Sequence, residues 1–598
     1  MSSPLSGATP HSSLPTLSKL RSTVASDICA ADIAKQWLDS FSNAIRAEDT
    51  STLNKLFVED AAWRDLLALT WDYRSIQGLT RITALFTDRV LTSGLQVSSL
   101  AISKDTHLSP TLSKPFPDLD LFWIQFGFGF DTALGRCVGI VRLLPLPDGT
   151  WKAYTVFTAL QSLWATKASF QLFPRPPVPE RTWNERRRRE MDLADGDPSV
   201  LIIGAGHCGL DTAAQLRQLG VSTLVVEKNA RVGDNWRKRY DSLCLHDPTW
   251  ADHMPFFSYP TVWPVYPSKD KLGDWHESYA RTLEINVWTS TIIDAAVWNP
   301  REKIWSVKVT REGQEKDLRV KHLVFATGTA SPRLAYRPEI PGKEDFRGDI
   351  LHSSEFKSSS AYKGKKALVV GACNSAHDIA QYLHETGVDV MMLQRSSTYV
   401  ISMRAIEAIL GLWADSSPVP RDVADLLGLS TPAQVTKLMH QHVFPGIAAG
   451  MDKGLREKLN AVDFRTNMGP DDAGIMQLYW SRGGGYYIDT GASESIANGG
   501  IKFVSGLALK EYTPSGVRLS DGTEIDVDLV VLATGFGDPR EIVRDICGAE
   551  VAGHLVPFWG LNEEGEIRSV WRYSGHERFW YASGKSSTYF NVGWHSGG

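Results

Sequence analysis

The sequence has few cysteines, and their spacing fits neither a disulfide framework nor a metal site. Only six occur among 598 residues, with no CxxC pair and no zinc-type spacing. Disulfide-stabilised and zinc-binding proteins carry such spacings, so we expect reduced thiols and a reducing compartment. The six are Cys29, Cys137, Cys208, Cys244, Cys373 and Cys547.

The chain also lacks an excess of positive charge and any long apolar run. Its formal net charge is −5, whereas nucleic acids and anionic membranes attract positively charged surfaces. No stretch approaches the roughly 18 uninterrupted apolar residues of a membrane-spanning helix, and there is no secretory h-region. We therefore expect a soluble, cytoplasmic protein with no nucleic-acid partner and no membrane partner.

Motifs of hydrolytic enzymes are missing as well. Neither GxSxG nor HExxH occurs, which argues against an α/β-type serine hydrolase and a zinc protease, and we expect no metal site. Hydrophobic residues make up 43% of the chain, an ordinary fraction that supports large cores. The sequence therefore indicates a large, globular, multidomain protein.

Two polar segments interrupt the apolar pattern. Residues 1–27 are rich in Ser, Thr and Pro and predict a disordered tail, with a transit peptide as the alternative. Four prolines and a run of four arginines predict a linker over residues 171–196. We interpret the arginine run as a solvated connecting helix, and a nuclear signal is the alternative.

Between these segments, residues 28–170 carry a helical pattern followed by strand-length apolar runs. Helical periodicity predicts helix from Ala31 to Leu91. Apolar residues recur four apart on one helix face at Ile33, Trp37, Phe41 and Ile45. The strands are predicted at residues 121–130, 138–144 and 151–160. Helices followed by strands predict an α+β domain.

A first phosphate-binding turn follows the buried strand at residues 200–203. Gly204 suits a tight turn, Gly206 lets the backbone approach a pyrophosphate, and Gly209 allows a helix to pack closely on the strand. The next strand ends at Glu227, where an acid accepts hydrogen bonds from a ribose 2′-OH. Strand, glycines, helix, strand and acid in this order predict an FAD site.

A second, degenerate turn begins at Gly371, with Cys373 and Ala376 in place of the second and third glycines. The strand that follows ends at Arg395 and Ser396 without an acid. An arginine fork pairs with a 2′-phosphate, which an acid would repel, so this turn predicts NADPH. A plain surface arginine is the alternative. We expect the Cys373 side chain to crowd the NADPH pyrophosphate.

The alternation of strands and helices from Pro198 onward predicts the α/β class, with two dinucleotide-binding, Rossmann-like domains after the α+β domain. The predicted FAD domain is discontinuous, over residues 197–358 and 526–598, and the NADPH domain is inserted at 359–525. Within the second turn, Asn374 and Ser375 are further predicted NADPH contacts.

Other motifs make the chain resemble the flavin-containing monooxygenase family from about Pro198 to Phe590. Residues 346–356 match the FxGxxxHxxx(Y/F) fingerprint. Its last position is Phe356 rather than the Trp of Baeyer–Villiger enzymes, which favours the N- and S-oxygenating and plant auxin-type branches. Residues 28–170, with Trp63-Arg64-Asp65 and Trp71-Asp72, resemble the NTF2-like cone domain of fungal members.

The resemblance implies an FAD- and NADPH-dependent monooxygenase that uses O2 and a small organic substrate through a C4a-hydroperoxyflavin. It also implies a hydrogen bond from His246 to the peroxyflavin region, and a histidine satisfied in the domain interior is the alternative. Further cofactor contacts come from the GDNWR segment, the YPSK segment and two ATG turns. These contacts are Trp236, Arg237, Tyr266, Ser268, Lys269, Thr327, Gly328, Thr534 and Gly535.

Several alternatives stay open. An NADPH-linked flavoprotein reductase would want a redox cysteine pair, which the sequence lacks. A catalytically impaired flavoprotein could act as a binding module through the cone domain, which also leaves a homodimer open. Relatives usually continue past Gly584 with an acid where this chain has Lys585, so we expect weakened FAD binding. The substrate could be an α-keto acid such as indole pyruvate, a soft amine or a thioether.

Overall fold

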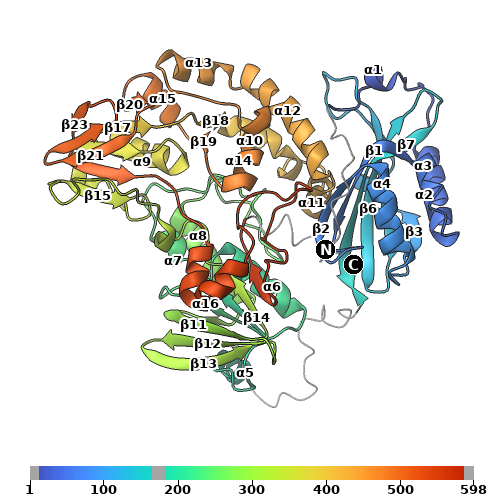
Figure 1. Ribbon diagram of the computed structural model, residues 1–598, viewed down its shortest axis with the longest axis horizontal. Helices are drawn as coiled ribbons and strands as arrows, with labels where there is room; N and C mark the ends of the chain where they lie inside the picture. The colour runs from blue at the N-terminus through green and yellow to red at the C-terminus, as the bar shows by residue number, and fades with distance from the viewer. Residues whose placement is uncertain (1–12, 165–181, 585–598) are drawn as a thin grey trace.

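The computed structural model describes residues 13–164 and 182–584, which form three lobes (Figure 1). The N-terminal lobe, residues 13–164, is built on a mixed seven-stranded sheet, and the other two lobes on five-stranded parallel sheets. Part of the predicted tail, the prolines of the predicted linker and the segment after Gly584 lie outside the described residues. No helix of the described part is long and apolar enough to cross a bilayer.

The N-terminal sheet confirms the three predicted strands. These are β5 (Trp123–Asp131), β6 (Gly135–Pro145) and β7 (Trp151–Leu163), which pair antiparallel in sequence order. The sheet order is β2-β1-β7-β6-β5-β3, with β4 pairing β5. The remaining strands are β1 (Phe57–Leu66), β2 (Tyr73–Gln77), β3 (Ser98–Ile102) and β4 (Thr111–Ser113).

The prediction of continuous helix from Ala31 to Leu91 was wrong in its middle. Helix α2 (Ala30–Arg46) forms as predicted and the short α3 (Leu53–Leu56) follows it, but the chain then continues as β1 and β2. The last six residues of β1 are all buried, so the strand lacks the apolar–polar alternation that identifies a strand from sequence. Helix resumes only in α4 (Leu79–Leu85) and a π-helical turn (Phe86–Leu91).

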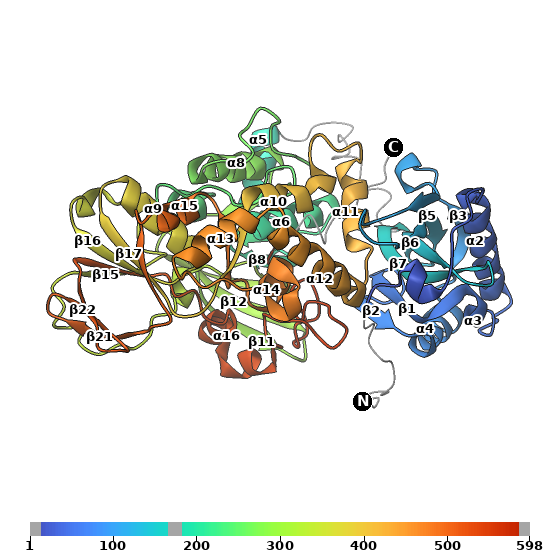
Figure 2. The same ribbon diagram turned by 90° about the horizontal axis from the view of Figure 1, so that it is seen from above.

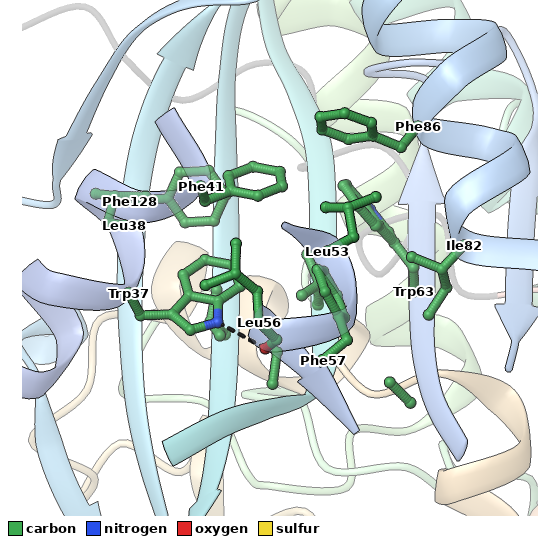
Figure 3. Packing of buried hydrophobic residues seen from close by; sticks show 14 of the residues in the cluster. Trp37, Leu38, Phe41, Leu53, Leu56, Phe57, Trp63, Ile82, Phe86 and Phe128 are labelled. Carbon is green, nitrogen blue, oxygen red and sulfur yellow. Dashed lines mark hydrogen bonds between the residues drawn. The ribbon is translucent and has the colours of Figure 1, made fainter. Parts of the chain in front are cut away.

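Aromatic side chains fill the space between α2 and the N-terminal sheet (Figure 3). Trp37 stacks on Phe41 with ring centroids 5.2 Å apart, and its indole N–H donates to the Leu56 carbonyl at 2.9 Å. Phe57 and Trp63 stack at 6.0 Å in the same cluster. Rings of this size bury large apolar areas, so this face of the sheet is occupied by the lobe's own core.

The first parallel sheet has the order β10-β9-β8-β14-β25. Helix α6 (His207–Gln218) follows β8, and β25 returns from near the end of the described chain to pair with β14. An antiparallel sheet of β11 (Thr291–Asn299), β12 (Ile304–Arg311) and β13 (Gln314–Val320) packs beside it. The parallel strands are β8 (Val200–Ile203), β9 (Thr223–Val226), β10 (Val287–Trp288), β14 (His322–Phe325) and β25 (Phe579–Tyr581).

The second parallel sheet has the order β15-β24-β16-β17-β20, and helix α9 (Asn374–Glu385) follows β16. β15 and β24 fall outside the predicted insert of 359–525. The predicted boundaries followed the motifs, whereas β24 pairs both β15 and β16 and so belongs to this sheet. Its strands are β15 (Asp349–His352), β16 (Lys366–Val370), β17 (Asp389–Gln394), β20 (Lys502–Ser505) and β24 (Leu529–Leu532).

A helical segment, residues 403–482, separates the second parallel sheet from the N-terminal lobe. Figure 2 shows α11 and α12 of this segment against the N-terminal sheet. Apolar residues of α11 join a buried cluster with residues of β1, β2, β6 and β7, so the second face of that sheet is also covered. The helices are α10 (Met403–Ile409), α11 (Arg421–Leu429), α12 (Ala433–Ala449), α13 (Lys453–Ala461) and α14 (Gly474–Arg482).

A buried ion pair connects the N-terminal lobe to the C-terminal part of the chain. The Arg64 guanidinium donates through Nε and Nη2 to the two carboxylate oxygens of Glu566, each at 2.8 Å. The two side chains are 9% and 1% exposed. Ser75 Oγ donates to the same carboxylate at 2.7 Å, and Arg64 Nη1 donates to the Leu429 carbonyl at 2.7 Å. Bidentate pairs of this kind are strong and fix relative orientation.

Replacing Glu566 with Ala leaves the Arg64 charge buried without its carboxylate. We expect the free energy of unfolding to fall by about 3–5 kcal/mol, measured by urea denaturation. Glu494→Ala is the control, because it removes an exposed ion pair with Lys458 and should cost less than about 1 kcal/mol. Equal stability of the two variants would show that Arg64–Glu566 does not hold the lobes together.

Candidate functional site

The first predicted phosphate-binding turn lies between β8 and α6, and two of its glycines are required by close contacts. Gly204 has φ +107°, and a Cβ there would lie 2.5 Å from the Ala326 carbonyl oxygen. A Cβ on Gly209 would lie 1.9 Å from the Gly204 carbonyl oxygen. The turn therefore cannot form with larger residues at these positions, as expected for a helix that packs closely on its strand.

The second turn repeats the contact of the first glycine, but it carries Ala376 at the position equivalent to Gly209. Gly371 has φ +133°, and a Cβ there would lie 2.4 Å from the Ala533 carbonyl oxygen. Ala326 and Ala533 open the two ATG turns and donate their amides to Ile203 and Val370, the last residues of β8 and β16. Each ATG turn thus packs its alanine carbonyl against the first glycine of a dinucleotide turn. The predicted contacts Thr327, Gly328, Thr534 and Gly535 follow directly after these alanines.

The middle position of each turn does not need glycine for backbone reasons. Gly206 has φ −85° and Cys373 has φ −111°, and both are extended N-caps of the following helix. A Cβ at residue 206 would meet only Asn235 Nδ2, at 3.4 Å. Burial raises the pKa of the Cys373 thiol, so it brings no negative charge to the turn. The crowding predicted for Cys373 is thus limited to the volume of its side chain.

The open glycine turn and the N-terminus of α6 fit a dinucleotide pyrophosphate, because unpaired N–H groups and the helix dipole favour an anion there. The N-terminus of α9 offers the same environment with Cys373 in the cradle. Asn374 and Ser375 lie in its first turn, and Asn374 Oδ1 accepts from the Ile488 amide at 2.9 Å.

Glu227 stabilises the first turn in addition to its predicted ribose contact. One carboxylate oxygen accepts from the Ala205 amide at 2.9 Å, and the other accepts from the amide and side chain of Asn229 at 2.9 and 2.7 Å. A carboxylate has about four acceptor sites, so one remains for a ribose hydroxyl. At the end of β17, Arg395 and Ser396 are exposed, as a contact for a 2′-phosphate requires.

The GDNWR segment packs α7 (Asp234–Arg237) tightly on α8 (Lys269–Thr282). Gly233 has φ +88°, and a Cβ there would lie 2.1 Å from the Gly273 carbonyl oxygen. Arg237 forms ion pairs with Asp234, Asp274 and Glu277, and Lys269 Nζ donates to the Arg237 carbonyl at 3.0 Å. The predicted cofactor contacts Arg237 and Lys269 are thus also structural links between these two helices. Trp236 packs on the nearby apolar cluster of Leu245, Tyr259 and Leu272.

The YPSK segment runs beside the loop that carries His246. The Leu245 amide donates to the Pro267 carbonyl, and the Lys269 amide donates to the Leu243 carbonyl, each at 2.9 Å. Ser268 is the N-cap of α8. The Tyr266 hydroxyl donates to Glu407 of α10 at 2.7 Å, so this segment contacts the helical segment as well. The structure therefore brings two separately predicted parts of the site together.

The fingerprint histidine, His352, links β15 to the second ATG turn. Its Nε2 lies 3.0 Å from the Gly535 carbonyl, and the Ser354 amide donates to its Nδ1 at 3.2 Å. Burial lowers the pKa of His352, so the imidazole is neutral with its proton on Nε2. Phe356, the last fingerprint residue, is buried against Tyr382 of α9. The fingerprint thus fixes how the second sheet meets its own turns.

His246 lies at the contact between the lobes of the two parallel sheets. Its Nε2 is 3.0 Å from Oδ2 of Asp378 on α9, and the Tyr240 hydroxyl donates to the same oxygen at 2.7 Å. Burial disfavours the imidazolium, but the Asp378 carboxylate outweighs it, and the pKa of His246 is raised. The pKa of Asp378 is lowered, since His246 and Tyr240 outweigh its burial. The catalytic role of His246 stays a prediction.

The residues predicted from the sequence did not include Asp378. Asp378 lies four residues after Asn374, so helical spacing sets both on one face of α9. That spacing was the available signal, but it does not reveal that the face meets a loop from another lobe.

Gly209→Ala tests the first turn. The added Cβ would meet backbone, so we expect a loss of at least about 1–3 kcal/mol of stability and of bound flavin, measured by unfolding and by absorbance of the purified protein. Gly553→Ala in α16 (Arg540–His554) is the control, because its Cβ meets nothing within 4 Å. Full flavin retention in Gly209→Ala would contradict the assignment of this turn.

Known proteins resemble more than half of this chain in sequence. The family model described as pyridine nucleotide-disulphide oxidoreductase matches residues 201–409. The chain is 32% identical over 345 residues to the probable indole-3-pyruvate monooxygenase YUCCA9 of Arabidopsis thaliana, covering 56% of this chain and 74% of that protein. It is 32% identical over 355 residues to the indole-3-pyruvate monooxygenase YUCCA1 of Oryza sativa subsp. japonica, covering 57% and 77%.

Among solved structures, the flavin-containing monooxygenase from Stenotrophomonas maltophilia is 17% identical with a TM-score of 0.43, over 64% of this chain and 90% of that one. The sequence relatives carry the assignment, because the chain covers about three quarters of their length at 32% identity. The chain belongs to the flavin-containing monooxygenase family, in its YUCCA-like branch, and is an NADPH- and O2-dependent enzyme.

Proposed function

We propose that the chain holds FAD and NADPH together and inserts one oxygen atom from O2 into a small organic substrate. The observation that supports this most is the pair of matching glycine turns at the carboxyl ends of two parallel sheets. One is followed by Glu227 and the other by Arg395, which suits a ribose hydroxyl and a 2′-phosphate respectively. From this difference we assign FAD to the first turn and NADPH to the second.

FAD would lie on the N-terminus of α6, with Gly204, Gly206 and Gly209 leaving room for its pyrophosphate. NADPH would lie on the N-terminus of α9, with Arg395 and Ser396 at its 2′-phosphate. Bound flavin supplies the redox chemistry with NADPH and O2, and the protein binds, orients and excludes competing reactions. The chain's own contribution near the flavin is His246, held as a hydrogen-bond donor.

The names of the YUCCA relatives suggest the first substrate class to examine. They are indole-3-pyruvate monooxygenases, so we propose an α-keto acid with an aromatic side chain as substrate. A soft amine or a thioether is the second class. Products formed from indole-3-pyruvate, a tertiary amine and a thioether, each measured against NADPH consumed, separate these classes.

Two other functions have less support. A disulfide reductase would need a cysteine pair, and all six cysteines are free. A binding module acting through the N-terminal lobe would need an open face on its sheet, yet α2 and an aromatic core cover one face and α11 and α12 the other. The division into domains also stays a proposal, with β15 and β24 assigned to the NADPH unit.

The deciding experiment measures NADPH oxidation, O2 consumption and oxygenated product with the purified flavoprotein. Equal amounts of all three support the proposal. NADPH oxidation without O2 consumption would indicate a reductase, and a protein that binds no flavin would indicate a binding module.

Arg395→Ala tests the NADPH assignment. Charge-assisted hydrogen bonds contribute about 1.5–3 kcal/mol, so we expect KM for NADPH to rise about tenfold or more, with kcat and the KM for NADH little changed. Steady-state kinetics with both nucleotides check this. Arg544→Ala, on the surface of α16, is the control. An unchanged KM for NADPH would make Arg395 a plain surface residue.

His246→Ala tests the predicted role of this side chain. Losing the hydrogen-bond donor should increase the share of consumed NADPH that appears as H2O2 instead of product, measured by a peroxide assay. His107→Ala is the control, since His107 lies in the N-terminal lobe. Unchanged coupling in His246→Ala would remove the role.

A further inference from the structure

Asp378 connects the lobes of the two parallel sheets through two side chains, Tyr240 and His246. It lies in the second turn of α9, the helix whose N-terminus would take the NADPH pyrophosphate, yet its carboxylate bonds to Tyr240 and His246 of the loop near the FAD turn. Thr490 Oγ1 is 3.5 Å from the other carboxylate oxygen. The Asp378 side chain is 10% exposed, so water competes little for these bonds.

The imidazole of His246 is constrained by this contact. Its Nε2 lies 3.0 and 3.2 Å from the two Asp378 oxygens, and a carboxylate accepts but does not donate. The proton on Nε2 is therefore committed to Asp378, and Nδ1 is the only ring nitrogen left for another partner. A charged imidazole carries a proton on Nδ1 as well and can donate there.

We propose that Asp378 is a positioning residue for His246, which orients the imidazole and keeps Nδ1–H as its donor toward the flavin site. The catalytic consequence of this proposal rests on the proposed function, whereas the contact between Asp378 and His246 does not. Asp378 is on α9 and His246 is on the other lobe. The Nδ1–H group of His246 is therefore held in place only while the two lobes keep this contact. The carboxylate thus couples the NADPH-binding helix to the flavin environment.

The charges around His246 support this arrangement. Besides Asp378, the groups that act on the charge of His246 are Asp247, which favours the imidazolium, and Arg239, which disfavours it. The pKa of His246 is raised in spite of burial, so removing the Asp378 charge should lower it. Neutral His377, whose pKa burial lowers to about 4, lies next to Asp378 on α9 and adds no charge at neutral pH.

The first test is a titration that does not depend on turnover. In histidine-labelled protein, the NMR signal of His246 is identified by its loss in His246→Ala. Its midpoint should fall in Asp378→Asn and stay in Asp389→Asn, which alters a surface ion pair with Lys502 in the same lobe. A midpoint unchanged in Asp378→Asn overturns the proposal, whether or not the protein proves to be a monooxygenase.

The second test is a double-mutant cycle on the holoenzyme, with the H2O2 share of consumed NADPH as readout. We expect Asp378→Asn to raise this share at least threefold with KM for NADPH changed less than twofold, and to have no further effect in the His246→Ala background. Asp378→Glu should restore part of the coupling. Equal effects of Asp378→Asn in both backgrounds would show that it acts independently of His246 and would overturn the proposal. Absence of any NADPH-driven O2 consumption in the unmutated enzyme would instead reject the proposed function.

Discussion

The arrangement of both candidate cofactor sites depends on one backbone contact, which the chain makes twice. The carbonyl of Ala326 or Ala533 lies against the first glycine of a turn so closely that a Cβ would approach it to about 2.5 Å. The same alanine donates its amide to the neighbouring strand. Each ATG turn is therefore part of the wall of a candidate nucleotide site, and the glycine that faces its alanine carbonyl is a steric requirement. The two turns differ at their second and third positions, where Cys373 and Ala376 replace glycine.

A second constraint fixes the position of the N-terminal lobe against the C-terminal part of the chain. A buried guanidinium is costly without a partner, and Arg64 finds its carboxylate at Glu566, in the last part of the chain before β25. Arg572 and Asp72 form a further bidentate pair beside it, with Nε–Oδ1 and Nη2–Oδ2 distances of 2.7 and 2.8 Å. Because β25 completes the first parallel sheet, these ion pairs let the N-terminal lobe hold the segment that leads into β25.

Local sequence predicted what local geometry determines. The two glycine turns, the strands before them and the helices after them follow from residue types within about 30 positions, and the three N-terminal strands follow from apolar runs. Contacts between distant segments could not be predicted in this way. β1 lost its alternation because α2 and α11 bury both of its faces. The predicted insert leaves out β15 and β24, although both strands belong to its sheet, because the residues of a strand do not identify its partner. Asp378 was missed for the same reason, since its partners lie in another lobe.

The contact at Asp378 shows why charge rather than apolar packing suits this junction. An imidazole buried to this extent would lose its proton in an apolar setting, and a buried carboxylate would gain one. Each stabilises the charged form of the other, and their pKa values move in opposite directions as a result. Separating the lobes would remove the pairing that keeps both groups charged. The pair therefore favours one relative position of the two lobes. The protonation of His246 depends on that position and not on the loop alone.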